Sequence, residues 1–333
     1  MERSRAVVYL AGRAVRGEAP DQQAIAAIDV KETLAFAKRH QLEAAVSMAL
    51  FSAGNRDGKV KTTLMQAAWR AHRLEQALRE VTEKLEAAGI WYLPLKGCAI
   101  KEDYPDPLMR EMSDIDLLID PARREDAREL MESLGYATVD FLKTKHDVYR
   151  KAPGLSFELH GELFPHFLNR TLYRCSMYYR DVKPRLVKDG GNAFGYHFRP
   201  EDFYLFLIAH TGKHFFQNGI GLRPLFDVYV YRNAHPLDMD YVRREAEKMG
   251  LNAFEEQLRS LSQHAVCGDA LPEDEQSMLT AMAEAGAFGS ARNMVKNLMA
   301  RQGGDVGSRL SALFSRLSVP FRRDDPRDRK SVV

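Results

Sequence analysis

The chain has 333 residues, 45% hydrophobic and 28% charged, and a formal net charge of +2. This composition is typical of a globular protein of two or three domains, excludes a largely disordered chain, and gives no whole-chain signal for nucleic acid binding. Three scattered cysteines form neither a disulfide framework nor a metal spacing, and no apolar stretch is long enough for a membrane span, so we expect a cytoplasmic protein without membrane contact.

Residues 1–61 are predicted to form an N-terminal region of short helices, including one over 30–53 and a break at the glycine-rich stretch 54–58. The next segment, 62–88, has apolar residues at helical spacing and predicts one long amphipathic helix. This helix begins the predicted α/β core, which we place at 62–199.

Within this core, short apolar or alternating runs predict strands, and one run with helical periodicity follows them. The expected order is strand, turn, connector, acidic strand, helix and a further acidic strand, a mixed pattern that favours an α+β fold with a small mixed sheet. These elements are 90–95, 96–97, 104–107, 112–119, 121–134 and 155–160.

The rest of the chain is mainly helical in prediction. A helix over 165–179 and a hairpin over 182–198 complete the core. A C-terminal helical domain is expected at 200–300, followed by a basic and mobile tail at 301–333. The predicted helices of this domain are 201–216, 224–233, 240–248, 253–267 and 273–285.

Two carboxylates, Asp114 and Asp116, alternate with apolar residues in the strand over 112–119. A period of two places both on one face of the strand, with α-carbons about 6.5–7 Å apart. Like charges this close repel, and a divalent cation removes that cost. Because Mg²⁺ prefers one or two carboxylates with phosphate oxygens, the pair indicates phosphoryl or nucleotidyl chemistry. The alternative explanation is a solvated pair of aspartates at the start of a strand, which has the same spacing.

Two neighbouring segments strengthen this interpretation. Lys96 and Gly97 follow the first strand, where a glycine lets backbone approach a phosphate and a lysine adds positive charge. Glu158 and His160 share a face of the strand over 155–160, so Glu158 is a third carboxylate for a two-metal site. An ordinary turn, a surface glutamate and a packing histidine are the alternative explanations.

The segment from Leu93 to His160 resembles the nucleotidyltransferases of the DNA polymerase β superfamily. It is most similar to the uncharacterised bacterial group in which Lys-Gly replaces the usual Gly-Ser turn, and the likeness extends over roughly 32–240. The matching segments are Leu95-Lys96-Gly97, Tyr104-Pro105, Arg110 to Leu118, Leu134-Gly135-Tyr136, Glu158-Leu159-His160, Asp202 to His214, and Leu222 to Asp227.

The resemblance implies roles for individual residues. Asp114 and Asp116 match the metal-binding pair, and Glu158 matches the carboxylate that helps activate the attacking hydroxyl. These three are the implied catalytic and metal residues, with Mg²⁺ or Mn²⁺ as the cofactor and a nucleoside triphosphate, expected to be ATP, as donor. Residues implied to contact the nucleotide are Lys96, Gly97, Arg110, Ser113, His160, His210, His214 and Arg223.

One departure from the superfamily pattern is Cys98, which stands where a serine usually follows the glycine. The serine contact to phosphate is therefore missing. This leaves open compensation by Lys96, a different donor, or an inactive relative.

The predicted C-terminal domain has its own polar group. His210 and His214 lie four residues apart and share a helix face, with Arg223 and Asp227 at the same spacing. The sequence lacks the H-E-x-x-H pattern of zinc sites, and the resemblance implies instead that His210, His214 and Arg223 line a cleft against the acidic strands. A solvated face with a weak Arg223–Asp227 ion pair is the alternative. The nearby aromatic residues Phe203, Tyr204, Phe206, Phe215 and Phe216 are expected in the core.

The expected reaction is transfer of a nucleoside monophosphate from a triphosphate to a hydroxyl of a small molecule or metabolite. Two alternatives stand: a toxin or defence enzyme that modifies tRNA or protein, mildly favoured by the basic tail, and an inactive nucleotide-binding module. Joint replacement of Asp114 and Asp116 with asparagine is expected to abolish transfer and to leave stability equal or higher.

Overall fold

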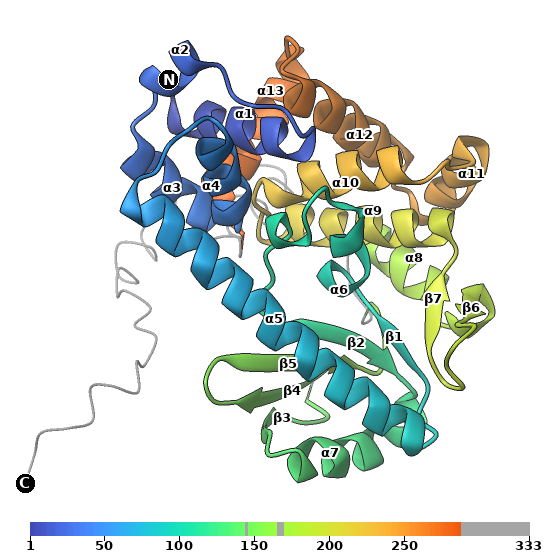
Figure 1. Ribbon diagram of the computed structural model, residues 1–333. Coiled ribbons are helices and arrows are strands. Elements are labelled where there is room, and N and C mark those ends of the chain that lie inside the picture. Colours follow the sequence, from blue (N-terminus) through green and yellow to red (C-terminus); the bar gives the residue numbers. More distant parts are fainter. Residues whose placement is uncertain (144–145, 165–169, 288–333) are drawn as a thin grey trace, which may run out of the picture.

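The computed structural model describes residues 1–143, 146–164 and 170–287; the predicted basic tail lies outside these ranges. A small mixed sheet lies at one end of the molecule and a larger body of helices at the other (Figure 1). The predicted α+β fold class is confirmed. Within the described residues, no helix combines the length and apolarity that crossing a membrane requires.

The sheet has five strands in the order β1-β2-β5-β4-β3. β2 pairs in parallel with β5, and all other neighbours are antiparallel. The parallel pair places the two acidic strands side by side at the centre of the sheet. Their bounds are β1 Tyr92–Pro94, β2 Ile115–Ile119, β3 Ala137–Asp140, β4 His146–Lys151 and β5 Leu155–His160.

One face of the sheet is covered by two helices, the long α5 (Gly58–Ala87) and α7 (Arg124–Ser133). The N-terminal end of α5 also reaches the other helices, where it packs on α4 (Glu43–Ser52) (Figure 1). The apolar residues of β2 and β5 pack against them in a separate core. Because the side chains of a strand alternate, the polar residues of β2 and β5 point to the opposite face.

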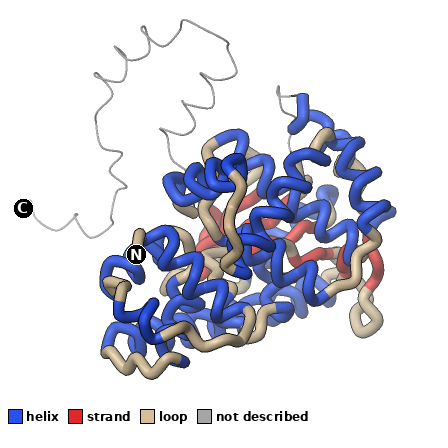
Figure 2. Tube along the Cα trace, turned by 90° about the horizontal axis from the view of Figure 1, so that it is seen from above, coloured by secondary structure: helices blue, strands red, loops and turns tan. Residues whose placement is uncertain are grey.

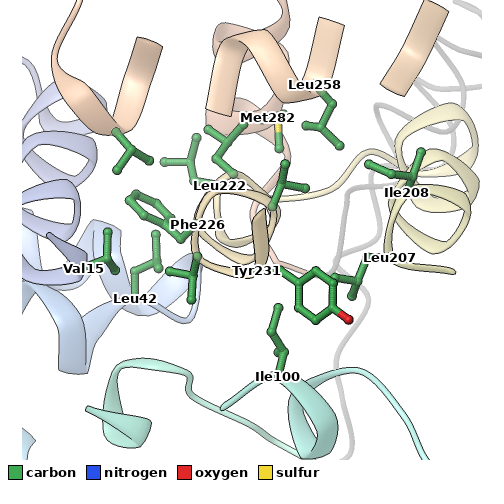
Figure 3. Packing of buried hydrophobic residues seen from close by; sticks show 14 of the residues in the cluster. Val15, Leu42, Ile100, Leu207, Ile208, Leu222, Phe226, Tyr231, Leu258 and Met282 are labelled. Atoms are coloured by element: carbon green, nitrogen blue, oxygen red, sulfur yellow. The ribbon is translucent and has the colours of Figure 1, made fainter. Parts of the chain in front are cut away.

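The helical body combines both ends of the described chain. Residues of α1 (Arg3–Val15) and α4 (Glu43–Ser52) share one apolar core with residues of α10 (Arg223–Ala234) and α12 (Asn252–Cys267). Figure 3 shows Phe226 of α10 among side chains from these neighbours, and seen from above the helices cover much of the sheet (Figure 2). The remaining helices are α2 Gln22–Ala26, α3 Val30–Arg39, α6 Gly97–Ile100, α8 Arg170–Tyr178, α9 Pro200–Gln217, α11 Met239–Met249 and α13 Glu273–Ala285.

A short hairpin, β6 (Leu186–Lys188) with β7 (Tyr196–Phe198), lies in the range predicted for one. The aromatic residues of α9 take the expected place, since Phe203, Tyr204 and Phe206 are buried and Phe215 and Phe216 pack against the same core. These aromatic residues therefore have a structural role. The polar side chains that could bind a ligand lie on the polar face of the sheet.

His40, at the end of α3, is fully buried and ties the N-terminal helices to α10. Its Nδ1 accepts a hydrogen bond of 3.2 Å from the N–H of Leu222. Burial, with a smaller contribution from Arg39, lowers the pKa of His40 from 6.5 to about 4. Since the unfolded chain binds the proton more tightly, stability is lost as pH falls from about 6.5 towards 4, by roughly 3 kcal/mol in total.

We expect urea unfolding at a series of pH values to show this loss for the natural chain and to show a smaller one for His40→Gln. His72→Gln is the matched control, because His72 lies exposed on α5. An equal acid slope in the natural chain and His40→Gln would assign the effect to other groups.

Candidate functional site

The polar face of the sheet brings together the acidic residues of β2 and β5. Asp116 lies directly opposite Glu158 in the parallel register, and Leu118 lies opposite His160. Paired positions on neighbouring strands project to the same face. The two carboxylates predicted from separate sequence segments are thus on one face, held by the backbone of the sheet.

Lys96 contributes the positive charge of this group. Its Nζ lies 2.6 Å from Oδ1 of Asp116, and its side chain is 19% exposed. Burial alone would lower the pKa of Lys96, but the charges of Asp116 and Glu158 outweigh it and the pKa is raised. Lys96 also has a left-handed φ of +50°, which costs a non-glycine residue roughly 1–2 kcal/mol. Strain of this kind is concentrated at functional sites.

Asp116 is held in its charged form. Burial opposes the charge, but Lys96 and a hydrogen-bonding contact of 2.9 Å to Nε2 of His160 outweigh burial, so the pKa of Asp116 is lowered. Asp114 behaves in the opposite way. Burial and the charge of Asp116 raise its pKa, although Lys96, Arg223 and a hydrogen bond from Ser113 Oγ of 3.0 Å favour its charged form. The group therefore has more negative charge than its lysine compensates.

Gly97 allows the turn after β1 to lie against the loop before β2. A Cβ at this position would be 2.5 Å from Sδ of Met112, so a side chain here would require the Met112 side chain to move. Cys98 follows, and burial raises the pKa of its thiol to about 12. The thiol is therefore neutral at physiological pH.

Arg110 lies in a buried joint between the sheet and α10. Its Nε is 2.6 Å from Oδ1 of Asp227, the two side chains are 4% and 8% exposed, and Tyr104 donates a 2.7 Å hydrogen bond to the same oxygen. Arg110 also donates to the carbonyl of Glu111. This geometry favours a structural role for Arg110 over the predicted phosphate contact. The alternative of a surface ion pair between Arg223 and Asp227 does not hold, since Asp227 is buried and bound by Arg110.

Arg223, at the start of α10, reaches the same region from the helical body. It donates to the side chain of Gln41 and, over 3.3 Å, to the carbonyl of Glu111. Burial and the nearby charge of Arg110 lower its pKa to about 10, so it is still charged at neutral pH. Its charge acts on Asp114. Arg223 thus places a positive charge of the helical body close to the acidic group.

His210 and His214 lie one turn apart on α9 with ring centroids 4.6 Å apart, and His210 also contacts the ring of Phe206. Their place against the acidic strands stays a prediction. His146 is a site residue that the sequence prediction lacks. It starts β4, pairs in register with His160, and its Nε2 lies 3.7 Å from Oε2 of Glu158. The sequence from His146 to Arg150 has two adjacent polar residues followed by two adjacent apolar ones, so it lacks the alternation that would have predicted a strand.

Asp114, Asp116 and Glu158 offer carboxylate oxygens, the type of donor that a hard divalent cation takes. Mg²⁺ and Mn²⁺ prefer carboxylate oxygens, and a bound cation would offset the burial and the charge of Asp116 that raise the pKa of Asp114. The residues present therefore suit the metal that the sequence resemblance implies.

One family model matches most of the chain. Residues 26–266 match the family described as "Uncharacterised nucleotidyltransferase". A solved structure, that of an antigenic nucleotidyltransferase-like protein from Paracoccidioides brasiliensis, aligns over 60% of this chain and 95% of its own, at 17% identity and a TM-score of 0.37. A likeness this distant supports no statement about function. No curated protein matches the chain.

Proposed function

The chain belongs to the family of uncharacterised nucleotidyltransferases, and from this premise we propose that it transfers a nucleoside monophosphate from a triphosphate, with ATP as the expected donor, to a hydroxyl of a small molecule. The observation that carries the proposal is the register of Asp116 opposite Glu158, with Lys96 within 2.6 Å of Asp116. Carboxylates and one ammonium on a sheet face are the groups that bind a metal-chelated triphosphate.

Asp114, Asp116 and Glu158 would hold Mg²⁺ or Mn²⁺, which when bound neutralises charge on the triphosphate. Lys96 orients a phosphate oxygen, exchanging its contact with Asp116 for one with the nucleotide. Gly97 lets the backbone of the turn approach the same phosphate. Glu158, the most exposed of the three strand residues that face this site, accepts the proton of the attacking hydroxyl. Arg223 balances the charge of Asp114 from the helical side.

The acceptor class is tested by incubating the full chain with Mg²⁺, α-labelled triphosphates and lysate separated into small molecules, RNA and protein. We expect label in the small-molecule fraction. Label in RNA or protein would instead support the tRNA- or protein-modifying alternative. Release of no pyrophosphate in any fraction would support the inactive binding module.

Lys96→Ala should weaken triphosphate binding by about 1–3 kcal/mol, the range for losing a hydrogen bond to a charged group. Calorimetric titration with a non-hydrolysable triphosphate and Mg²⁺ measures this. Lys188→Ala is the control, because Lys188 is exposed on β6. Equal affinity of Lys96→Ala and the natural chain would remove Lys96 from the nucleotide site.

A further inference from the structure

Three side chains beside the carboxylate group form a second possible metal centre. Nε2 of His146 and Nε2 of His160 lie 3.7 Å and 3.6 Å from Oε2 of Glu158. One ligand atom from each residue lies within 4.8 Å of those of the other two. The two imidazole rings are tilted by 52°, with centroids 4.9 Å apart. Two nitrogen donors and one oxygen donor thus surround one point.

The sheet itself creates this cluster. In the antiparallel β4–β5 pair, His146 lies opposite His160, and Glu158 precedes His160 by two residues on β5. All three therefore project from the face that carries Asp116. Ligands on hydrogen-bonded central strands are held with less freedom than ligands on loops, so the cluster is preorganised.

The separations suit metal coordination better than direct hydrogen bonding. Both N–O distances exceed the range of a hydrogen bond between these atoms. Nitrogen and oxygen ligands about 2.0–2.2 Å from a tetrahedral ion lie roughly 3.3–3.6 Å apart. The observed nitrogen–oxygen distances of 3.6 and 3.7 Å need only a small adjustment to reach this ligand–ligand separation.

The donor types decide which ion fits. Mg²⁺ takes oxygen ligands, whereas imidazole nitrogen suits zinc and its neighbours among the transition metals. His160 is 1% exposed, while His146 and Glu158 are each 23% exposed, so the cluster is open on one side. Three protein ligands with one open position are the arrangement of reactive zinc centres rather than closed structural ones.

We propose that His146, Glu158 and His160 bind a divalent transition-metal ion of the zinc class next to the carboxylate group, in a site that shares Glu158 with the Mg²⁺ site and adds two imidazole nitrogens. Nε2 of His160 now contacts Asp116, so ion binding replaces that contact while Asp116 keeps Lys96 at 2.6 Å. The ion site stands without the proposed reaction. Only the catalytic role of the ion rests on the proposed reaction. In that reaction the open position would bind the acceptor hydroxyl, and the ion and Glu158 would together favour loss of its proton.

The test uses the full chain, stripped with chelator and titrated with Co²⁺, whose visible absorption reports nitrogen ligation in a low-coordinate site. We expect one equivalent to bind, Zn²⁺ to displace it, and excess Mg²⁺ to leave it in place. His146→Ala and the more conservative His146→Gln should each weaken Co²⁺ binding at least about tenfold, with melting curves to confirm folding. His197→Ala is the matched control, because His197 is an exposed strand histidine paired with Asp189.

Equal Co²⁺ binding by the natural chain and both His146 variants would overturn the site, as would displacement of Co²⁺ by equimolar Mg²⁺. Asp114→Asn separates the two proposals, because Asp114 is not one of the three ligands. It should retain Co²⁺ and lose nucleotide transfer. Transfer by a chain that binds no Co²⁺ would reject this site alone, and Co²⁺ binding without transfer under any condition would reject the proposed function alone.

Discussion

Replacing Asp114 and Asp116 with asparagine, one at a time, should abolish nucleotide transfer in both variants while shifting stability in opposite directions. Transfer should fall more than about 100-fold in each, because even residues that only support metal ligands cost 10–100-fold when replaced. Asp114→Asn should melt at an equal or higher temperature, since burial and the charge of Asp116 raise the pKa of Asp114 and make its charge unfavourable.

Asp116→Asn should instead lose about 3 kcal/mol or more of unfolding free energy, because it leaves the Lys96 ammonium buried without its partner. The expectation from sequence concerned the joint replacement and stays a prediction; for Asp116→Asn alone we expect a loss, because Lys96 and His160 lower the pKa of Asp116. Melting curves in chelator, paired with a transfer assay in Mg²⁺, measure both effects. Normal transfer by either folded variant would make that aspartate part of the scaffold.

The second large effect is expected at the buried joint of Arg110 and Asp227. Asp227→Ala should lower the free energy of unfolding by about 3–5 kcal/mol, because it strands the Arg110 guanidinium in the interior. The double replacement Arg110→Met with Asp227→Leu should recover most of this loss, since apolar residues of similar volume often replace a buried pair without cost. Denaturant unfolding of the single and double variants measures the coupling.

Asp240→Ala is the control for this joint. Asp240 pairs with Arg243 on the exposed surface of α11, and such pairs contribute about 0–1 kcal/mol. If Arg110 instead binds phosphate, Arg110→Met would leave stability unchanged and weaken triphosphate binding. That result would contradict the structural role and restore the contact implied by the sequence resemblance.

The elements with a strong period were predictable from sequence. The alternation of β2 and β5 gave both strands and the face shared by Glu158 and His160. The long helix predicted over 62–88 corresponds to α5, which begins four residues earlier because Asp57 caps it. Local patterns sufficed in these cases because burial of one face determines the pattern directly.

Contacts between distant segments were not predictable in the same way. Nothing local in the sequence pairs Arg110 with Asp227, 117 residues away, or places Lys96 on Asp116. His146 lies opposite His160 because β4 pairs with β5 in a particular register. A single segment of sequence does not determine that register. The candidate carboxylates were therefore predictable from the sequence, whereas the positions of the cations and the histidine around them depend on the fold.

The most direct measurement is a comparison of ATP labelled at the α-phosphate with ATP labelled at the γ-phosphate, each incubated with the full chain, Mg²⁺ and the acceptor fraction. We predict that α-label enters the acceptor, that γ-label leaves as pyrophosphate, and that Asp116→Asn abolishes both. Transfer of the γ-label to the acceptor would contradict nucleotidyl transfer, and so would α-label transfer that persists in Asp116→Asn.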